Sequence, residues 1–119
     1  MLSGKRILIV EDEPIIALDL AAAVVDGEGT VVGTAVTVEQ AHRLLASEPC
    51  DAVILDLRLK DGLATAIADR LRDLGIPFVI HSGQADSICA TAWPGVPVVG
   101  KPALPEQVMA TLVCAMGAR

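Results

Sequence analysis

Short runs of apolar residues alternate along the chain with longer segments in which apolar residues recur every three or four positions. The short runs are typical of strands buried on both faces, and the longer segments are typical of amphipathic helices. The pattern predicts five strands, at residues 5–10, 30–36, 51–56, 78–81 and 96–99. It predicts helices over residues 14–27, 37–47 and 63–74, and a last helix defined by Leu104, Val108, Leu112 and Met116. Residues 82–94 have a poor apolar stripe, and within them 87–92 are the candidate for one more short helix.

Strands that alternate with helices predict a doubly wound α/β domain with a parallel sheet and right-handed crossovers. The second strand is half polar, and Pro97 within the fifth is tolerated only at a sheet edge, so we expect both at the edges. The strand order 2-1-3-4-5 fits best, which is the flavodoxin-like order with helices on both faces. We expect residues 1–119 to form this single domain, without linker or repeat.

Composition excludes several classes of protein. The net charge is −6, which argues against the basic face of a nucleic-acid-binding protein, and Phe78 and Trp93 are the chain's two aromatic residues. No apolar run reaches the roughly 18 residues of a membrane span, and the first residues do not form a signal peptide. The three cysteines lack metal-site spacing. We therefore expect a cytoplasmic protein with no nucleic-acid or membrane partner.

Three acidic residues and one lysine follow predicted strands. Glu11 and Asp12 end the first strand, Asp56 ends the third, and Lys101 follows the fifth. In this strand order the first and third strands flank the crevice where ligands bind. Three carboxylates in one crevice repel one another unless a cation lies among them, and Mg²⁺ prefers oxygen ligands of this kind. The sequence therefore predicts a magnesium site.

A carboxylate beside such an ion can attack a phosphoryl group and form an aspartyl phosphate. Lys101 is available as a point charge for the phosphoryl oxygens, and Ser82 as a hydroxyl donor. Each of these residues alone is equally compatible with a solvated loop. Their common location at one end of the sheet favours a site for phosphoryl transfer.

Four segments resemble the bacterial response-regulator receiver domain: Val10–Pro14, Ile54–Leu57, Ser82–Gly83 and Lys101–Pro102. The resemblance covers the whole chain. It implies that Asp56 accepts a phosphoryl group from a histidine kinase. It also implies that Mg²⁺, for which Mn²⁺ can substitute, is the cofactor.

Roles for the other residues also come from the resemblance. Asp12 and Asp56 would bind the metal directly, Glu11 through water, and Arg58 through its main-chain carbonyl. Ser82, Gly83 and Lys101 would hold the phosphoryl oxygens, and the bond from Lys101 to Pro102 is expected to be cis. Asp56 and Lys101 would thus be the catalytic residues of the domain's own phosphorylation and dephosphorylation, in a protein that is otherwise no enzyme.

The chain departs from typical receivers at two places. The aromatic switch residue three positions before the lysine is Val98 here, and Gly62 comes about two residues early. The segment from Pro77 to Gly83 resembles that of the FATGUY receivers, which stand alone, lack the aromatic switch and are often paired with kinases of the HWE or HisKA2 type. The resemblance to that group implies a partner of the same kind.

We therefore expect a single-domain response regulator without an output domain, either monomeric or weakly dimeric. It would signal by binding a downstream protein or a phosphotransfer protein, or act as a phosphate sink. One alternative is a receiver that binds partners without phosphorylation. A less favoured one is an aspartate-nucleophile phosphatase, which usually has a second acid two residues after the nucleophile, where this chain has Arg58.

Three further residues carry weaker expectations. Strand alternation should point His81 away from the Ser82 side chain, so His81 is interpreted as a packing or surface residue. His42 is expected to be solvated. Trp93 is interpreted either as a partner contact or, in preference, as a cover for the end of a short helix.

Overall fold

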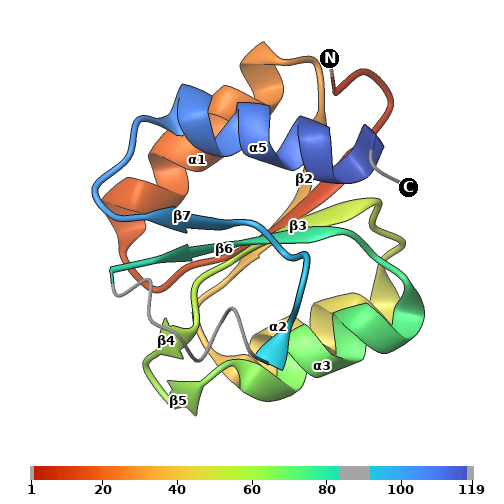
Figure 1. Ribbon diagram of the computed structural model, residues 1–119, viewed down its shortest axis with the longest axis vertical. Coiled ribbons are helices and arrows are strands. Elements are labelled where there is room, and N and C mark those ends of the chain that lie inside the picture. Colours follow the sequence, from red (N-terminus) through yellow and green to blue (C-terminus); the bar gives the residue numbers. More distant parts are fainter. Residues whose placement is uncertain (1, 84–91, 118–119) are drawn as a thin grey trace.

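A computed structural model of the chain describes residues 2–83 and 92–117. Its main sheet has five parallel strands in the order β2-β1-β3-β6-β7 (Figure 1). In this order the strands are β2 (Thr30–Ala35), β1 (Arg6–Val10), β3 (Ala52–Leu55), β6 (Phe78–Ser82) and β7 (Val98–Gly100). The predicted strand order is confirmed, with the half-polar second strand and the last strand at the two edges.

Helices cover both faces of this sheet. α1 (Pro14–Asp26) and α5 (Pro105–Gly117) pack together on one face, and α2 (Val38–Ser47) and α3 (Thr65–Leu74) lie on the other (Figure 1). Among the described residues, no helix combines the length and the apolar character that a membrane span requires. The α/β, flavodoxin-like architecture predicted from the sequence is therefore confirmed.

The central strands are apolar over most of their length because each contributes to two cores. In β1, Ile7 and Ile9 pack towards α1 and α5, whereas Leu8 and Val10 pack towards α2 and α3. All four side chains are fully buried. Successive side chains of a strand point to opposite faces, so a strand covered on both sides has no place for a polar residue until it ends. Polar residues are thereby confined to the rim.

Local signals fix the helix ends. Pro14 is the first residue of α1, where its missing N–H costs nothing. Thr37 caps α2 by accepting a hydrogen bond from the Gln40 N–H at 3.1 Å. The Gln40 side chain accepts from the Val36 N–H at 2.9 Å, whereas in a standard capping box it would accept from the N–H of the cap residue Thr37. Gly75 ends α3 in the left-handed conformation, with φ of 72°.

Several boundaries differ from the prediction. The last strand begins at Val98 instead of Val96 and continues to Gly100. A short antiparallel hairpin, β4 (Arg58–Leu59) and β5 (Gly62–Leu63), lies between β3 and α3 and was not predicted. Leu104, which helped to define the last helix, is 63% exposed and precedes it. Its spacing is helical, but α5 buries Val108, Met109 and Leu112.

The expectation for His42 is wrong, and so is the less favoured of the two interpretations of Trp93, that of a partner contact. His42 is half-buried, and the Arg70 guanidinium donates to its carbonyl at 3.1 Å and contacts its Nδ1 at 3.0 Å. Trp93 is 2% exposed, so it is a core residue and no partner contact, and its indole N–H donates to Asp69 at 2.9 Å. The candidate helix at 87–92 falls almost wholly outside the described residues.

Candidate functional site

The two central strands place their terminal acids side by side. Val10 of β1 is aligned with Leu55 of β3, and the Asp56 N–H donates to the Val10 carbonyl at 2.9 Å. The Glu11 N–H donates to the Ala35 carbonyl at the end of β2, also at 2.9 Å. The neighbouring positions of Glu11 and Asp56 therefore result from parallel pairing, because adjacent parallel strands end at the same edge of the sheet.

Three carboxylates converge at this edge. Glu11, Asp12 and Asp56 each offer an oxygen, and these oxygens all lie within 4.8 Å of one another. Glu11 is 1% exposed and Asp56 is 4% exposed, whereas Asp12 is half-buried. The predicted convergence of these acids is thus present in the structure.

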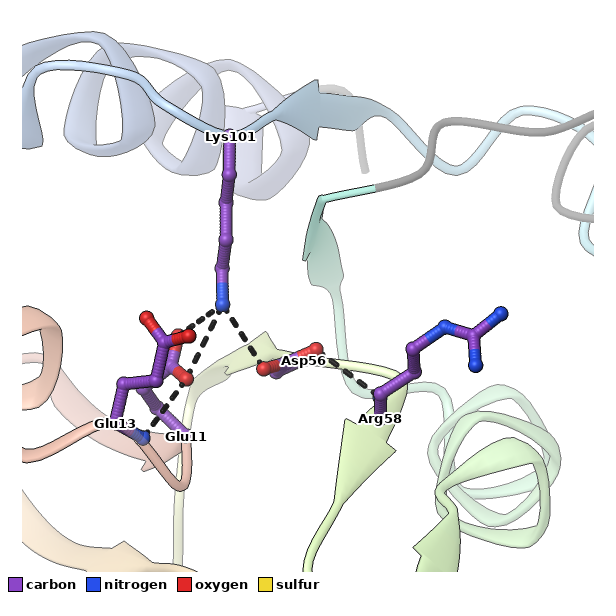
Figure 2. A network of polar contacts seen from close by, with 5 residues as sticks. All are labelled: Glu11, Glu13, Asp56, Arg58 and Lys101. Carbon is purple, nitrogen blue, oxygen red and sulfur yellow. Dashed lines mark hydrogen bonds and ion pairs between the residues drawn. The ribbon is translucent and has the colours of Figure 1, made fainter.

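Lys101 reaches the same cluster from the end of β7 (Figure 2). Its Nζ lies 2.9 Å from Glu11 Oε1, 3.2 Å from Glu11 Oε2 and 2.9 Å from Asp56 Oδ2. The Lys101 N–H also donates to the Ser82 carbonyl at 2.8 Å, which joins the ends of β6 and β7. The peptide bond between Lys101 and Pro102 is cis, as expected.

Burial and charge shift the proton affinities in this cluster. Burial raises the pKa of Glu11 to about 7, against the opposing effect of Lys101 and with a smaller upward contribution from Asp56. Burial alone would lower the pKa of Lys101, but its bonds to Glu11 and Asp56 outweigh this and raise it. Lys101 therefore remains an ammonium at neutral pH and holds the two buried acids together.

The loop after Asp56 contributes its main chain. The Arg58 N–H donates to Asp56 Oδ1 at 3.0 Å, so both Asp56 oxygens have a partner, one in Arg58 and one in Lys101. The Arg58 guanidinium points away from the carboxylates (Figure 2). Glu11 Oε2 also accepts from the Glu13 N–H at 3.2 Å, a contact that sequence analysis missed. Ser82 is buried at the end of β6, and Gly83 follows it exposed.

The donor set fits a hard divalent cation. Three carboxylates and one ammonium leave a formal charge of −2 in a largely buried space. Mg²⁺ and Mn²⁺ prefer carboxylate oxygens, and Mg²⁺ is commonly held by one or two of them with water completing its shell. Burial is the main cause of the raised pKa of Glu11, and a bound cation would oppose it by favouring the carboxylate form.

His81 lies on the face of the sheet that α1 and α5 cover, opposite the face covered by α2 and α3. It is 3% exposed and lines a cavity of about 440 Å³ with Ile16 and Leu20 of α1. Neither ring nitrogen has a hydrogen-bond partner among the residues that the structure describes, and burial, followed by the charge of Lys101, lowers the pKa of the ring. His81 is thus a packing residue, as strand alternation predicted.

One further residue at this edge was not singled out from the sequence. Asp61, in the turn of the β4–β5 hairpin, accepts a hydrogen bond from the Val38 N–H at the start of α2, at 2.8 Å. The Asp-Gly pair at 61–62 identifies a turn, but nothing in its spacing indicates a partner 23 residues earlier. Contacts of this range come from the fold.

Comparison with known proteins agrees with this geometry. The family model described as the response regulator receiver domain matches residues 7–111. The phyllosphere-induced regulator PhyR of Methylorubrum extorquens is 32% identical over 114 residues. That match covers 92% of this chain and 42% of the relative, so the chain spans less than half the length of PhyR.

Two solved structures are similar over nearly the whole chain. The response regulator PhyR from Brucella abortus is 30% identical, with a TM-score of 0.85, over 98% of this chain and 49% of its own. SdrG from Sphingomonas melonis Fr1 is 34% identical, with a TM-score of 0.81. That likeness covers 94% of this chain and 95% of SdrG.

Proposed function

Because this chain belongs to the response regulator receiver domain family, we propose that it is a phosphoacceptor in which Asp56 receives a phosphoryl group from a histidine kinase. The observation that carries the proposal is the arrangement at Lys101. One ammonium is bonded to Glu11 and Asp56, two of the three carboxylates whose oxygens lie within 4.8 Å of one another. This arrangement supports the proposal, because it brings a candidate nucleophile, a positive charge and candidate metal ligands together at one edge of the sheet.

In the proposed transfer, an Asp56 oxygen attacks the phosphorus atom of a phosphohistidine. A P–O bond forms, the P–N bond breaks, and the leaving imidazole takes up a proton from water to become neutral. Oδ2 is the oxygen suited to attack, since Oδ1 is held by the Arg58 N–H while Oδ2 faces the Lys101 ammonium. As the bond forms, Lys101 is available to pair with the phosphoryl oxygens, whose negative charge it stabilises.

Mg²⁺ bound here would neutralise charge on the transferred phosphoryl group. We propose that Asp12 and Asp56 bind it directly, Glu11 through water, and Arg58 through its carbonyl oxygen. Mn²⁺ should substitute, since it takes the same oxygen ligands. Ser82 and Gly83 follow β6 at the same edge of the sheet and are proposed to contact the phosphoryl oxygens together with Lys101.

The signal must pass on without the usual aromatic residue, because Val98 occupies its position. We infer that the chain is closest to the FATGUY receivers and is phosphorylated by a kinase of the HWE or HisKA2 type. Output would follow through binding of a protein partner or transfer to a phosphotransfer protein, or the chain would serve as a phosphate sink. The intact acid cluster and Lys101 favour a phosphorylated receiver over one that binds partners without phosphorylation.

Labelling by a small phosphodonor tests the proposal. Wild-type protein, Asp56→Asn and Asp51→Asn are incubated with acetyl phosphate and Mg²⁺, and their intact masses are compared. Asp51 is the matched control, because it bonds the Arg6 N–H at the opposite end of β3. We expect one phosphoryl group on the wild type and on Asp51→Asn, none on Asp56→Asn, and none when Mg²⁺ is chelated. Equal labelling of all three proteins, or no labelling of the wild type, would refute the proposal that Asp56 is the phosphoacceptor.

A further inference from the structure

We propose that Asp61 is a positioning residue for the phosphoacceptor site. It fastens the β4–β5 hairpin to the N-terminus of α2, and the hairpin in turn holds the Arg58 main chain against Asp56. The inference rests on the proposed function, because it assigns a role in metal binding to a residue that itself touches neither metal nor phosphoryl group.

The first contact joins Asp61 to α2. Its Oδ1 accepts from the Val38 N–H at 2.8 Å, and its Oδ2 lies 3.5 Å from the Glu39 nitrogen, a much weaker contact. The next N–H group, that of Gln40, is satisfied by Thr37. The free N–H groups at a helix start carry partial positive charge and favour an anionic acceptor. The N-terminus of α2 is therefore capped by two side chains, that of the adjacent residue Thr37 and that of Asp61, which lies 23 residues after Val38.

The second step is the hairpin itself. Its two ladder pairs are Arg58 with Leu63 and Leu59 with Gly62, and Gly62 has φ of 133°, a conformation that other residues rarely adopt. Two residues per strand are too few to keep a hairpin in place alone. Leu59, which is 8% exposed, anchors one side of it in the core. Asp61 anchors the turn to α2 through a polar contact.

The third step connects the hairpin to the chemistry. Arg58 begins β4, and its N–H is the group that holds Asp56 Oδ1 at 3.0 Å. Its carbonyl is the proposed main-chain ligand of the metal. A hairpin released from α2 would let this peptide move, although every ligand side chain stayed in place. Residues that orient ligands in this way affect metal affinity nearly as much as some ligands do.

Magnesium affinity, measured by titration calorimetry, separates this role from simple helix capping. We expect Asp61→Ala to weaken Mg²⁺ binding on the order of tenfold, the lower end of what loss of a ligand-orienting partner causes. Phosphorylation should slow at limiting Mg²⁺ and recover at saturating Mg²⁺. Asp61→Asn keeps an oxygen acceptor for the Val38 N–H but removes the charge. It should bind Mg²⁺ within about twofold of wild type if the bond matters more than the charge.

Thr37→Ala is the control variant, since it removes the other side-chain cap of α2 without touching the hairpin. It should leave Mg²⁺ affinity unchanged. Amide hydrogen exchange gives a readout that needs no metal: the Arg58 N–H should exchange faster in Asp61→Ala than in Thr37→Ala. Equal effects of the two substitutions, or no effect of Asp61→Ala, would overturn the inference. A wild type that neither binds Mg²⁺ nor becomes phosphorylated would instead refute the proposed function, and the exchange result would still decide the role of Asp61.

Discussion

Without metal, the stability of the Glu11→Gln variant relative to wild type should increase from pH 5.5 to pH 8. Glu11 is 1% exposed, shares Lys101 with Asp56, and has its pKa raised to about 7, mainly by burial. Between pH 4.5 and 7 the folded chain keeps a proton on Glu11 that the unfolded chain has released. Stability therefore falls as the pH rises through this range, by the linkage of proton binding to folding.

The size of the effect follows from the two pKa values. A folded pKa of about 7 against an unfolded value of 4.5 corresponds to a loss of about 2 kcal/mol between pH 5.5 and 8, at roughly 1.4 kcal/mol per pKa unit. Glutamine has nearly the same shape and does not titrate, so Glu11→Gln escapes this loss. The altered hydrogen bonds of the glutamine side chain to Lys101 and to the Glu13 N–H change the stability of the variant equally at both pH values, so they cancel in the comparison.

Urea unfolding followed by circular dichroism, with a chelator present, measures this difference. The free energy of unfolding of Glu11→Gln minus that of wild type should rise by about 2 kcal/mol from pH 5.5 to pH 8. Glu39→Gln is the control, because the Glu39 side chain is 76% exposed and pairs with Arg43 at the surface. If the free energy of unfolding of Glu11→Gln minus that of wild type did not change with pH, burial would not raise the pKa of Glu11 in the folded protein.

Four further outcomes are expected. Lys101→Met should lower the free energy of unfolding at pH 8 by about 3 kcal/mol in urea titration, because Glu11 and Asp56 lose their shared counter-charge; unchanged stability would contradict the ion pairs. Trp93→Phe should cost about 1 kcal/mol through loss of the indole bond to Asp69, and a neutral result would show that this bond contributes nothing. Mg²⁺ at about 100 times its dissociation constant should add about 3 kcal/mol to wild-type stability. The apparent affinity of the protein for Mg²⁺ should weaken below pH 7 as Glu11 gains a proton. An affinity independent of pH would contradict a role of the Glu11 carboxylate in Mg²⁺ binding.

Most of the fold was predictable because it depends on burial. Strands covered on both faces require unbroken apolar runs, such as Ile7 to Val10, and such runs are visible in the sequence. The β4–β5 hairpin was missed because strands of two residues have no period to detect. Leu104 misled the prediction of the last helix since its helical spacing says nothing about exposure, and it is 63% exposed.

The site was predictable for a related reason. Polar residues that end buried strands gather at one edge of a parallel sheet, so Glu11, Asp56 and Lys101 meet there although they are far apart in sequence. Contacts between side chains and distant main-chain groups were not predictable. The bonds from Trp93 to Asp69 and from the Val38 N–H to Asp61 depend on how loops pack, and no local pattern specifies them.

The proposed function requires that Glu11, Asp12 and Asp56 bind one divalent cation beside Lys101. Titration with paramagnetic Mn²⁺, followed by residue-resolved NMR, tests this most directly. A cation shared by these acids should cause saturable broadening centred on residues 11–12 and 56–58, which an excess of Mg²⁺ reverses. Broadening that does not saturate, or that centres on exposed acids elsewhere, would contradict it.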